Sequence, residues 1–163
     1  MPRPKLHATR HDLPQEVREK AIAQLNQHLA DSFDLFSQIK QAHWNVKGLQ
    51  FHQLHLLFDT LAESTEEYID TIAERTTALG GSAMGTVRMS AAASRLPEYP
   101  TDALDGRQHV EALAERFAAL GASVRAAIGA AEEFGDVDTA DLFTQISRGL
   151  DQHLWFLEAH VQG

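Results

Sequence analysis

Residues 51–79 read FHQLHLLFDTLAESTEEYIDTIAERTTAL, and this segment carries the clearest structural pattern of the chain. Core-type side chains recur at every third or fourth position, the spacing that keeps them on one face of an α-helix. Gly80 and Gly81 follow at once, and glycine is favoured directly after the last turn of a helix. The segment therefore predicts one long amphipathic helix that ends near Leu79. Its core-facing positions are Leu54, Phe58, Leu61, Thr65, Tyr68, Ile69, Ile72, Thr76 and Leu79.

Three further stretches show helical spacing, at about 14–45, 105–134 and 138–160. Gly48 separates the first of these from 51–79, so the two helices are expected to form a hairpin. Asp12 is a candidate N-cap for the first helix.

The connection between the two halves of the chain is long. It spans residues 80–104, contains Pro97 and Pro100, and is expected to carry a short helix near 90–96. No segment shows the alternation of a β-strand. Two helical hairpins joined by one long crossover predict an all-α, ferritin-like four-helix bundle.

The composition favours one soluble, cytoplasmic domain. The 163 residues suffice for one hydrophobic core, and no apolar run of about eighteen residues predicts a membrane span. The N-terminus has no apolar signal segment, and the absence of cysteine excludes disulfides and thiolate metal sites. A bound metal would have to be held by nitrogen and oxygen, and nine histidines with 23 acidic residues supply both.

The charge is divided unevenly along the chain. The net charge is −9, but residues 1–11 carry Arg3, Lys5 and Arg10 without any acidic residue, which leaves −12 for the remainder. An acidic body argues against a nucleic-acid-binding globular surface, whereas a basic arm can reach phosphates. We therefore expect a flexible, weakly basic arm at residues 1–12 and a bundle domain at residues 13–163.

The helix at 51–79 also has a polar face. At roughly 100° per residue, four potential metal ligands lie within about 100° of one another and away from the core stripe. They are His55, Asp59, Asp70 and Glu74. A solvated acidic face is the ordinary explanation, since charged side chains usually lie opposite an apolar stripe. However, these ligands form two pairs with a spacing of four residues, so the members of each pair can converge on one ion.

The two pairs lie about 22 Å apart along one helix, so they cannot share an ion within one subunit. An identical helix packed antiparallel about a two-fold axis would bring His55 opposite the partner's Glu74, and Asp59 opposite the partner's Asp70. The interface of a two-fold dimer is self-complementary. This arrangement predicts two equivalent metal sites, each built from both subunits.

His43 is a further candidate ligand, because it continues the register of Phe36 and Ile39 at the end of the first helix. A buried core histidine is the alternative for His43. The chain contains no Glu-x-x-His, the motif of di-iron sites inside ordinary four-helix bundles. An intersubunit site is therefore the better candidate, and imidazole with carboxylates favours iron over manganese or zinc.

Several segments resemble the Dps family (DNA-binding protein from starved cells), a group of mini-ferritins. They are His43-Trp44-Asn45-Val46-Lys47-Gly48, then Phe51, His55 and Asp59, then Asp70-Thr71-Ile72-Ala73-Glu74-Arg75, and the C-terminal SRGLDQHLWFLE at residues 147–158. The resemblance covers about residues 10–160. All five ligand positions of the family are filled.

The resemblance implies a homododecameric hollow shell with ferroxidase sites at its two-fold interfaces. The ligands implied from one subunit are His43, His55 and Asp59, and those from its partner are Asp70 and Glu74. The implied reaction is oxidation of Fe(II), preferentially by hydrogen peroxide and otherwise by dioxygen. Ferric mineral would be stored in the cavity, and DNA would thereby be protected from oxidative damage.

The resemblance also assigns roles outside the ligand set. Trp44 would quench stray oxidising equivalents, with plain packing as the alternative. Asp136, Asp138 and Asp141 lie where the family's three-fold pores are lined, and symmetry-related copies would attract cations. Asp138 could instead cap the last helix, so Asp136 and Asp141 are the candidate residues of an iron-entry pore.

Arg3, Lys5 and Arg10 predict at most weak, strongly salt-dependent DNA binding and nucleoid association through many copies of the arm. The alternative is an ordinary terminus. Other functions stay open: a nucleoid-compacting protein with a secondary metal site, a non-enzymatic scaffold, and a protein that binds another metal without turnover. Deleting residues 1–11 would abolish the main effect of the first, and replacing His43 and Asp70 would leave the second unchanged.

Overall fold

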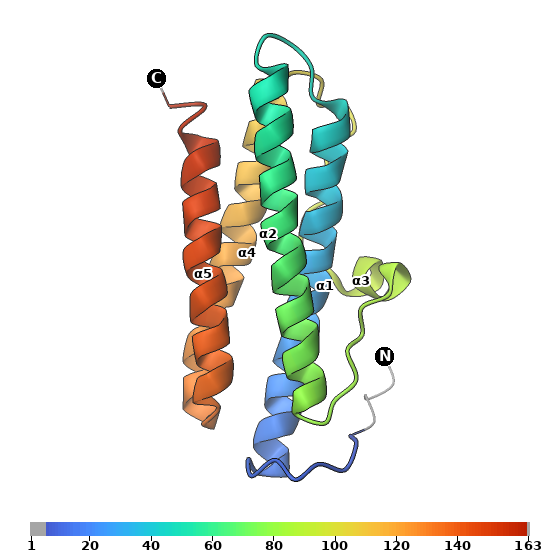
Figure 1. Ribbon diagram of the computed structural model, residues 1–163, viewed down its shortest axis with the longest axis vertical. Coiled ribbons are helices and arrows are strands. Elements are labelled where there is room, and N and C mark those ends of the chain that lie inside the picture. Colours follow the sequence, from blue (N-terminus) through green and yellow to red (C-terminus); the bar gives the residue numbers. More distant parts are fainter. Residues whose placement is uncertain (1–5, 163) are drawn as a thin grey trace.

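The computed structural model describes residues 6–162, and helices are the only regular elements over that range. They are α1 (Gln15–Asn45), α2 (Phe51–Ala78), α3 (Val87–Ala93), α4 (Gly106–Phe134) and α5 (Val137–Glu158). The four long helices lie side by side, and the short α3 projects from one flank of the bundle (Figure 1). α1 packs on α2 and α4 on α5, which confirms the predicted two hairpins joined by one long crossover.

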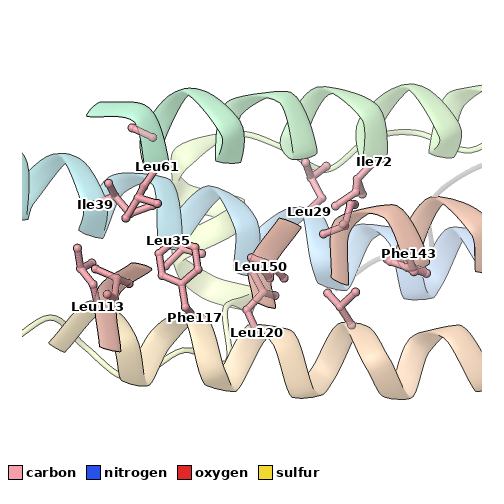
Figure 2. Packing of buried hydrophobic residues seen from close by; sticks show 14 of the residues in the cluster. Leu29, Leu35, Ile39, Leu61, Ile72, Leu113, Phe117, Leu120, Phe143 and Leu150 are labelled. Carbon is pink, nitrogen blue, oxygen red and sulfur yellow. The ribbon is translucent and has the colours of Figure 1, made fainter. Parts of the chain in front are cut away.

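The core runs along the axis of the bundle and receives side chains from all four long helices. Figure 2 shows Leu29, Leu35, Ile39, Leu61, Ile72, Leu113, Phe117, Leu120, Phe143 and Leu150 converging there. The predicted core stripe of α2 is confirmed, because Leu54, Phe58 and Thr65 are fully buried. Burying one such large apolar side chain contributes roughly 1.5–3 kcal/mol. Truncation of Phe58 to alanine would therefore cost about 3–5 kcal/mol.

The starts of α1, α3 and α5 differ from the expectation drawn from the sequence. α1 begins after Pro14 without any side-chain cap bond, so the prediction of Asp12 as its N-cap is wrong. α3 begins three residues earlier than expected, because Thr86 accepts a hydrogen bond from the Met89 N–H. α5 is capped by Asp136, whose carboxylate accepts from the backbone of its first turn, rather than by Asp138.

One end of the bundle joins the α1–α2 turn to the start of α4. Gly48 turns the chain with a φ of 104°, a left-handed conformation that glycine adopts without strain. A parallel backbone bridge pairs Lys47 with Asp105. Asp105 and Gln108 form a capping box that fixes the start of α4. The end of α1 that carries His43 is therefore held against α4.

Residues 6–14, the described part of the chain before α1, have no helical structure. Leu6 packs against the core, and the His7 N–H donates to the Gly80 carbonyl over 2.7 Å. Arg3 and Lys5 lie outside the described residues. The domain division between residues 12 and 13 stays a prediction. Over residues 6–162, no helix has the length and apolar character needed to cross a membrane.

Candidate metal-binding face

The α1–α2 hairpin places two of the predicted ligands face to face. The rings of His43 and His55 stack with their centroids 3.8 Å apart. Nδ1 of each ring lies 2.9 Å from the backbone carbonyl oxygen of the other residue. A carbonyl oxygen only accepts, so both Nδ1 atoms carry the proton and donate. Each Nε2 then keeps a lone pair that can bind a metal, with its ring already oriented.

His43 is nearly buried and His55 is half-buried. The sequence left open whether His43 is an ordinary core histidine. Its stacking on the partly exposed His55 places it near the surface of the hairpin, and its binding role stays a prediction. His55 lies on the polar face of α2, as its helical position predicted.

Asp59 lies one turn beyond His55 on α2. Its Oδ1 is 3.8 Å from His43 Nδ1 and accepts a hydrogen bond from Lys40 Nζ at 2.8 Å. This bond is the largest cause that lowers the pKa of Asp59; desolvation opposes it, and the charge of Lys40 adds to the lowering. The carboxylate is therefore ionised at neutral pH and accessible to a cation.

Asp70 and Glu74 are exposed farther along the same helix and are not brought to the histidines. Within residues 6–162, a single subunit contains no group of three or more histidine, aspartate or glutamate side chains able to hold a metal ion. The helix thus presents His55 and Asp59 near one end and Asp70 and Glu74 near the other. That the two halves meet across an interface between two subunits, and the ligand roles themselves, stay predictions.

Trp44 follows His43 directly and is 67% exposed. Lys40 Nζ lies 6.0 Å from the centre of its ring, within range of a cation–π contact. Plain packing within one subunit, the alternative considered from the sequence, does not account for a tryptophan with this exposure.

Asp136 and Asp141, the two candidate residues of an iron-entry pore, differ in exposure and in their contacts. Asp136 is 1% exposed, and its carboxylate accepts hydrogen bonds from Arg75 at 2.8 Å and from Thr139. A pore role for Asp136 would require this carboxylate to leave its internal partners. Asp141 is exposed on α5 and needs no such rearrangement.

Two residues outside the predicted set, Lys40 and Arg75, shape these sites. Lys40 precedes His43 by three residues, so helical spacing alone would have placed it beside the site. Arg75 follows Glu74 and pairs with Asp136, which is 61 residues away in the chain. Nothing in the local sequence pattern of Arg75 indicates that distant partner.

The chain is similar to known proteins both in sequence and in structure. The ferritin-like domain family matches residues 22–163. A DNA protection during starvation protein of Agrobacterium fabrum is 46% identical over 158 residues, which cover 97% of this chain and 98% of that protein. General stress protein 20U of Bacillus subtilis is 29% identical over 89% of this chain and 99% of that protein.

Solved structures that are similar to this chain also include Dps proteins. DpsC from Streptomyces coelicolor superposes with a TM-score of 0.93 at 31% identity, covering 98% of this chain and 93% of that one. The Dps protein of Vibrio cholerae O1, described as a member of a superfamily of ferritin-like diiron-carboxylate proteins, has a TM-score of 0.88 at 27% identity. That match covers 96% of this chain and 99% of the other.

Proposed function

Because this chain belongs to the Dps family of ferritin-like proteins, we propose that it oxidises Fe(II) and stores the ferric product inside a homododecameric shell. The observation that carries the proposal is the His43–His55 pair. Its two Nδ1–H groups are fixed on backbone carbonyls, which leaves two Nε2 lone pairs beside an ionised Asp59. Nitrogen and carboxylate donors of this kind suit iron.

The site is completed by the partner subunit. When two copies of α2 pack antiparallel, the partner's Asp70 and the partner's Glu74 come opposite Asp59 and His55. Each two-fold interface then holds two equivalent sites. The half-sites are some 22 Å apart on one helix, which is why one subunit is not sufficient.

The residues act on iron as substrate by binding and orienting it. The histidines hold two donor atoms in fixed directions, and the carboxylates offset the positive charge of Fe(II) and of the Fe(III) product. Hydrogen peroxide is the preferred oxidant and dioxygen the alternative. Two Fe(II), one hydrogen peroxide and two protons give two Fe(III) and two water molecules. This two-electron reduction releases no hydroxyl radical.

Further residues support the same function. Trp44 is exposed directly beside His43 and is placed to give an electron to a stray oxidant. Asp141 is the better candidate for an entry pore, since Asp136 is engaged inside the subunit. Arg3, Lys5 and Arg10 would add weak DNA binding in the cytoplasm, in line with relatives that are called DNA protection during starvation proteins.

The test is Fe(II) oxidation in the assembled protein. Protein loaded with Fe(II) without oxygen is mixed with hydrogen peroxide or air, and ferric absorbance is followed for wild type and a His43→Ala/Asp70→Ala variant. Fast oxidation by peroxide that is lost in the double variant would support the proposal. Glu16→Gln is a matched control, because it removes an exposed carboxylate on α1 that pairs only with Lys20. Equal rates in all three proteins would refute it.

A further inference from the structure

The crossover places a tyrosine beside a buried histidine of α4. The hydroxyl of Tyr99 lies 2.5 Å from Nδ1 of His109, and the two rings are nearly parallel, with an interplanar angle of 16°. His109 is 1% exposed and Tyr99 is half-buried. The two side chains form a short hydrogen bond that is shielded from water.

The direction of this hydrogen bond follows from the two ionisation equilibria. Burial raises the pKa of Tyr99, so its phenol keeps the proton at neutral pH. Burial lowers the pKa of His109, so its imidazole is neutral. The phenol therefore donates to Nδ1, and the ring proton of His109 sits on Nε2. The carbonyl of Asn45 and the charge of Asp105 act against the lowering of the His109 pKa, and both would stabilise an imidazolium.

The backbone just before Tyr99 is fastened to the bundle. Arg116 donates to the Glu98 carbonyl, and its guanidinium lies 5.9 Å from the centre of the Tyr99 ring. Gln38 donates to the Pro97 carbonyl and accepts from Arg116. Tyr99 is therefore held at a fixed distance from His109.

The second tyrosine of the chain provides a contrast. Tyr68 is also half-buried, and burial raises its pKa as well. Its hydroxyl packs against the backbone of Gly149 on α5. Over residues 6–162 no histidine forms a hydrogen bond with it. The two tyrosines thus have similar burial but differ in the presence of a base.

We propose that Tyr99 and His109 form a redox-active pair that takes up one-electron oxidising equivalents escaping from the iron site. The inference rests on the proposed function for the source of the oxidant, a hydroxyl radical formed when Fe(II) reduces peroxide by one electron. Tyr99 loses one electron to this oxidant, and its phenolic proton moves to His109 Nδ1. The products are a neutral tyrosyl radical, a protonated His109 and hydroxide. A further Fe(II) then returns an electron while His109 returns the proton.

The position of the pair suits this role. His109 lies near the end of α1, because the Asn45 carbonyl is close enough to affect its pKa, and Asn45 directly follows Trp44 and lies two residues after His43. A phenol gives up an electron readily only when a base takes its proton in the same step, and His109 is placed to be that base. His109 is a positioning and proton-accepting partner, whereas Tyr99 is the group oxidised.

The experiment has an iron-dependent and an iron-free arm. In the first, Fe(II)-loaded protein is mixed with hydrogen peroxide, freeze-quenched and examined by electron paramagnetic resonance. In the second, metal-free protein is oxidised by azide radicals from pulse radiolysis, which needs no ferroxidase activity. A tyrosyl radical is expected in both arms for wild type and Tyr68→Phe, and its loss in both for Tyr99→Phe.

His109→Gln tests the base separately, because glutamine can accept the hydrogen bond but not the proton. The tyrosyl yield should fall in this variant, although Tyr99 is retained and Fe(II) oxidation continues. A radical that persists in Tyr99→Phe, or a yield unchanged in His109→Gln, would overturn the proposal. A Tyr99 radical in the iron-free arm without Fe(II) oxidation in the other would refute the proposed function and leave the redox pair standing.

Discussion

His43 and His55 orient each other: each donates its Nδ1–H to the backbone carbonyl of the other over 2.9 Å. Many metal-binding histidines are oriented by a carboxylate or a distant carbonyl. Here the hairpin itself performs that task, because the two residues lie on the helices that Gly48 connects. The geometry of the proposed site therefore depends on the α1–α2 turn as well as on the ligands.

Replacing Lys40 by methionine should weaken metal binding in acid and strengthen it at neutral pH. The Lys40 ammonium lowers the pKa of Asp59, so its removal raises that pKa towards the ordinary value. Asp59 will then be protonated at a higher pH, and the loss of binding on acidification will move upward. At neutral pH Asp59 stays ionised without a competing cation, so Co(II), as a probe for Fe(II), should bind more tightly. Spectroscopic Co(II) titrations from acid to neutral pH check both effects, and unchanged curves would contradict them.

Substitutions of Asp136 and Asp141 should have different effects. The first should reduce the stability of the fold, and the second should reduce the rate of iron entry. Asp136→Asn leaves Arg75 without its buried anionic partner and should lower the free energy of unfolding by about 3–5 kcal/mol. Asp141→Asn, at an exposed position, should change it by no more than about 0.5 kcal/mol but slow Fe(II) entry. Denaturant unfolding and oxidation rates at limiting Fe(II) measure the two properties. A stable Asp136→Asn protein with slow iron uptake would reverse the assignment.

The protein should lose stability as the pH falls below neutrality. Burial lowers the pKa values of His28, His109 and His153 in the folded state. The unfolded chain binds protons from about pH 6.5 downward, while the folded chain does so only at lower pH, so acidification favours unfolding. Each histidine contributes a slope of up to ~1.4 kcal/mol per pH unit in that window.

Unfolding free energies at fixed protein concentration, measured near pH 7.5 and again in mild acid, test this expectation. His28→Gln should reduce the pH dependence, whereas His160→Gln, at an exposed histidine, should leave it unchanged. A free energy of unfolding that rises on acidification would have the wrong sign for buried neutral histidines.

DNA binding should be weak and should depend steeply on salt. Arg3, Lys5 and Arg10 are few against a body charge of −12, so only the many arms of one shell together can hold DNA. Gel-shift titrations at low and physiological salt should show binding that is lost in an Arg3→Ser/Lys5→Ser/Arg10→Ser variant, with Fe(II) oxidation retained. Salt-resistant binding, or binding by the triple variant, would show that another surface contacts DNA.

Much of the fold could be predicted from the sequence because helical periodicity and glycine stops are local signals. The core stripe of α2, from Leu54 to Leu79, is an example, and so is the polar face that carries His55. The residues that cap the helices were harder to predict. Asp12 and Asp138 are of the same type as Asp105 and Asp136, the aspartates that do cap helices. Only the three-dimensional path of the chain shows that Asp136 rather than Asp138 accepts from the first turn of α5.

The candidate site, like the fold, has features that the sequence predicts and others that it does not. The four-residue spacings of His55/Asp59 and Asp70/Glu74 are visible in the sequence. The reciprocal bonds of His43 join residues on two helices, and the Tyr99–His109 pair joins the crossover to α4. Contacts of this kind depend on how helices pack, which no local pattern encodes.

The proposed site shared between two subunits is tested most directly by complementation. One variant, His43→Gln/His55→Gln, lacks the histidine half of the site, and the other, Asp70→Asn/Glu74→Gln, lacks the acidic half. Each variant alone should assemble but oxidise Fe(II) no faster than the uncatalysed reaction. In shells assembled from equal amounts of both, half of the two-fold interfaces are mixed, and each mixed interface restores one of its two sites. Oxidation at about a quarter of the wild-type rate is therefore predicted. Mixed shells as inactive as either parent would show that the ligands do not come from two subunits, and would contradict the account.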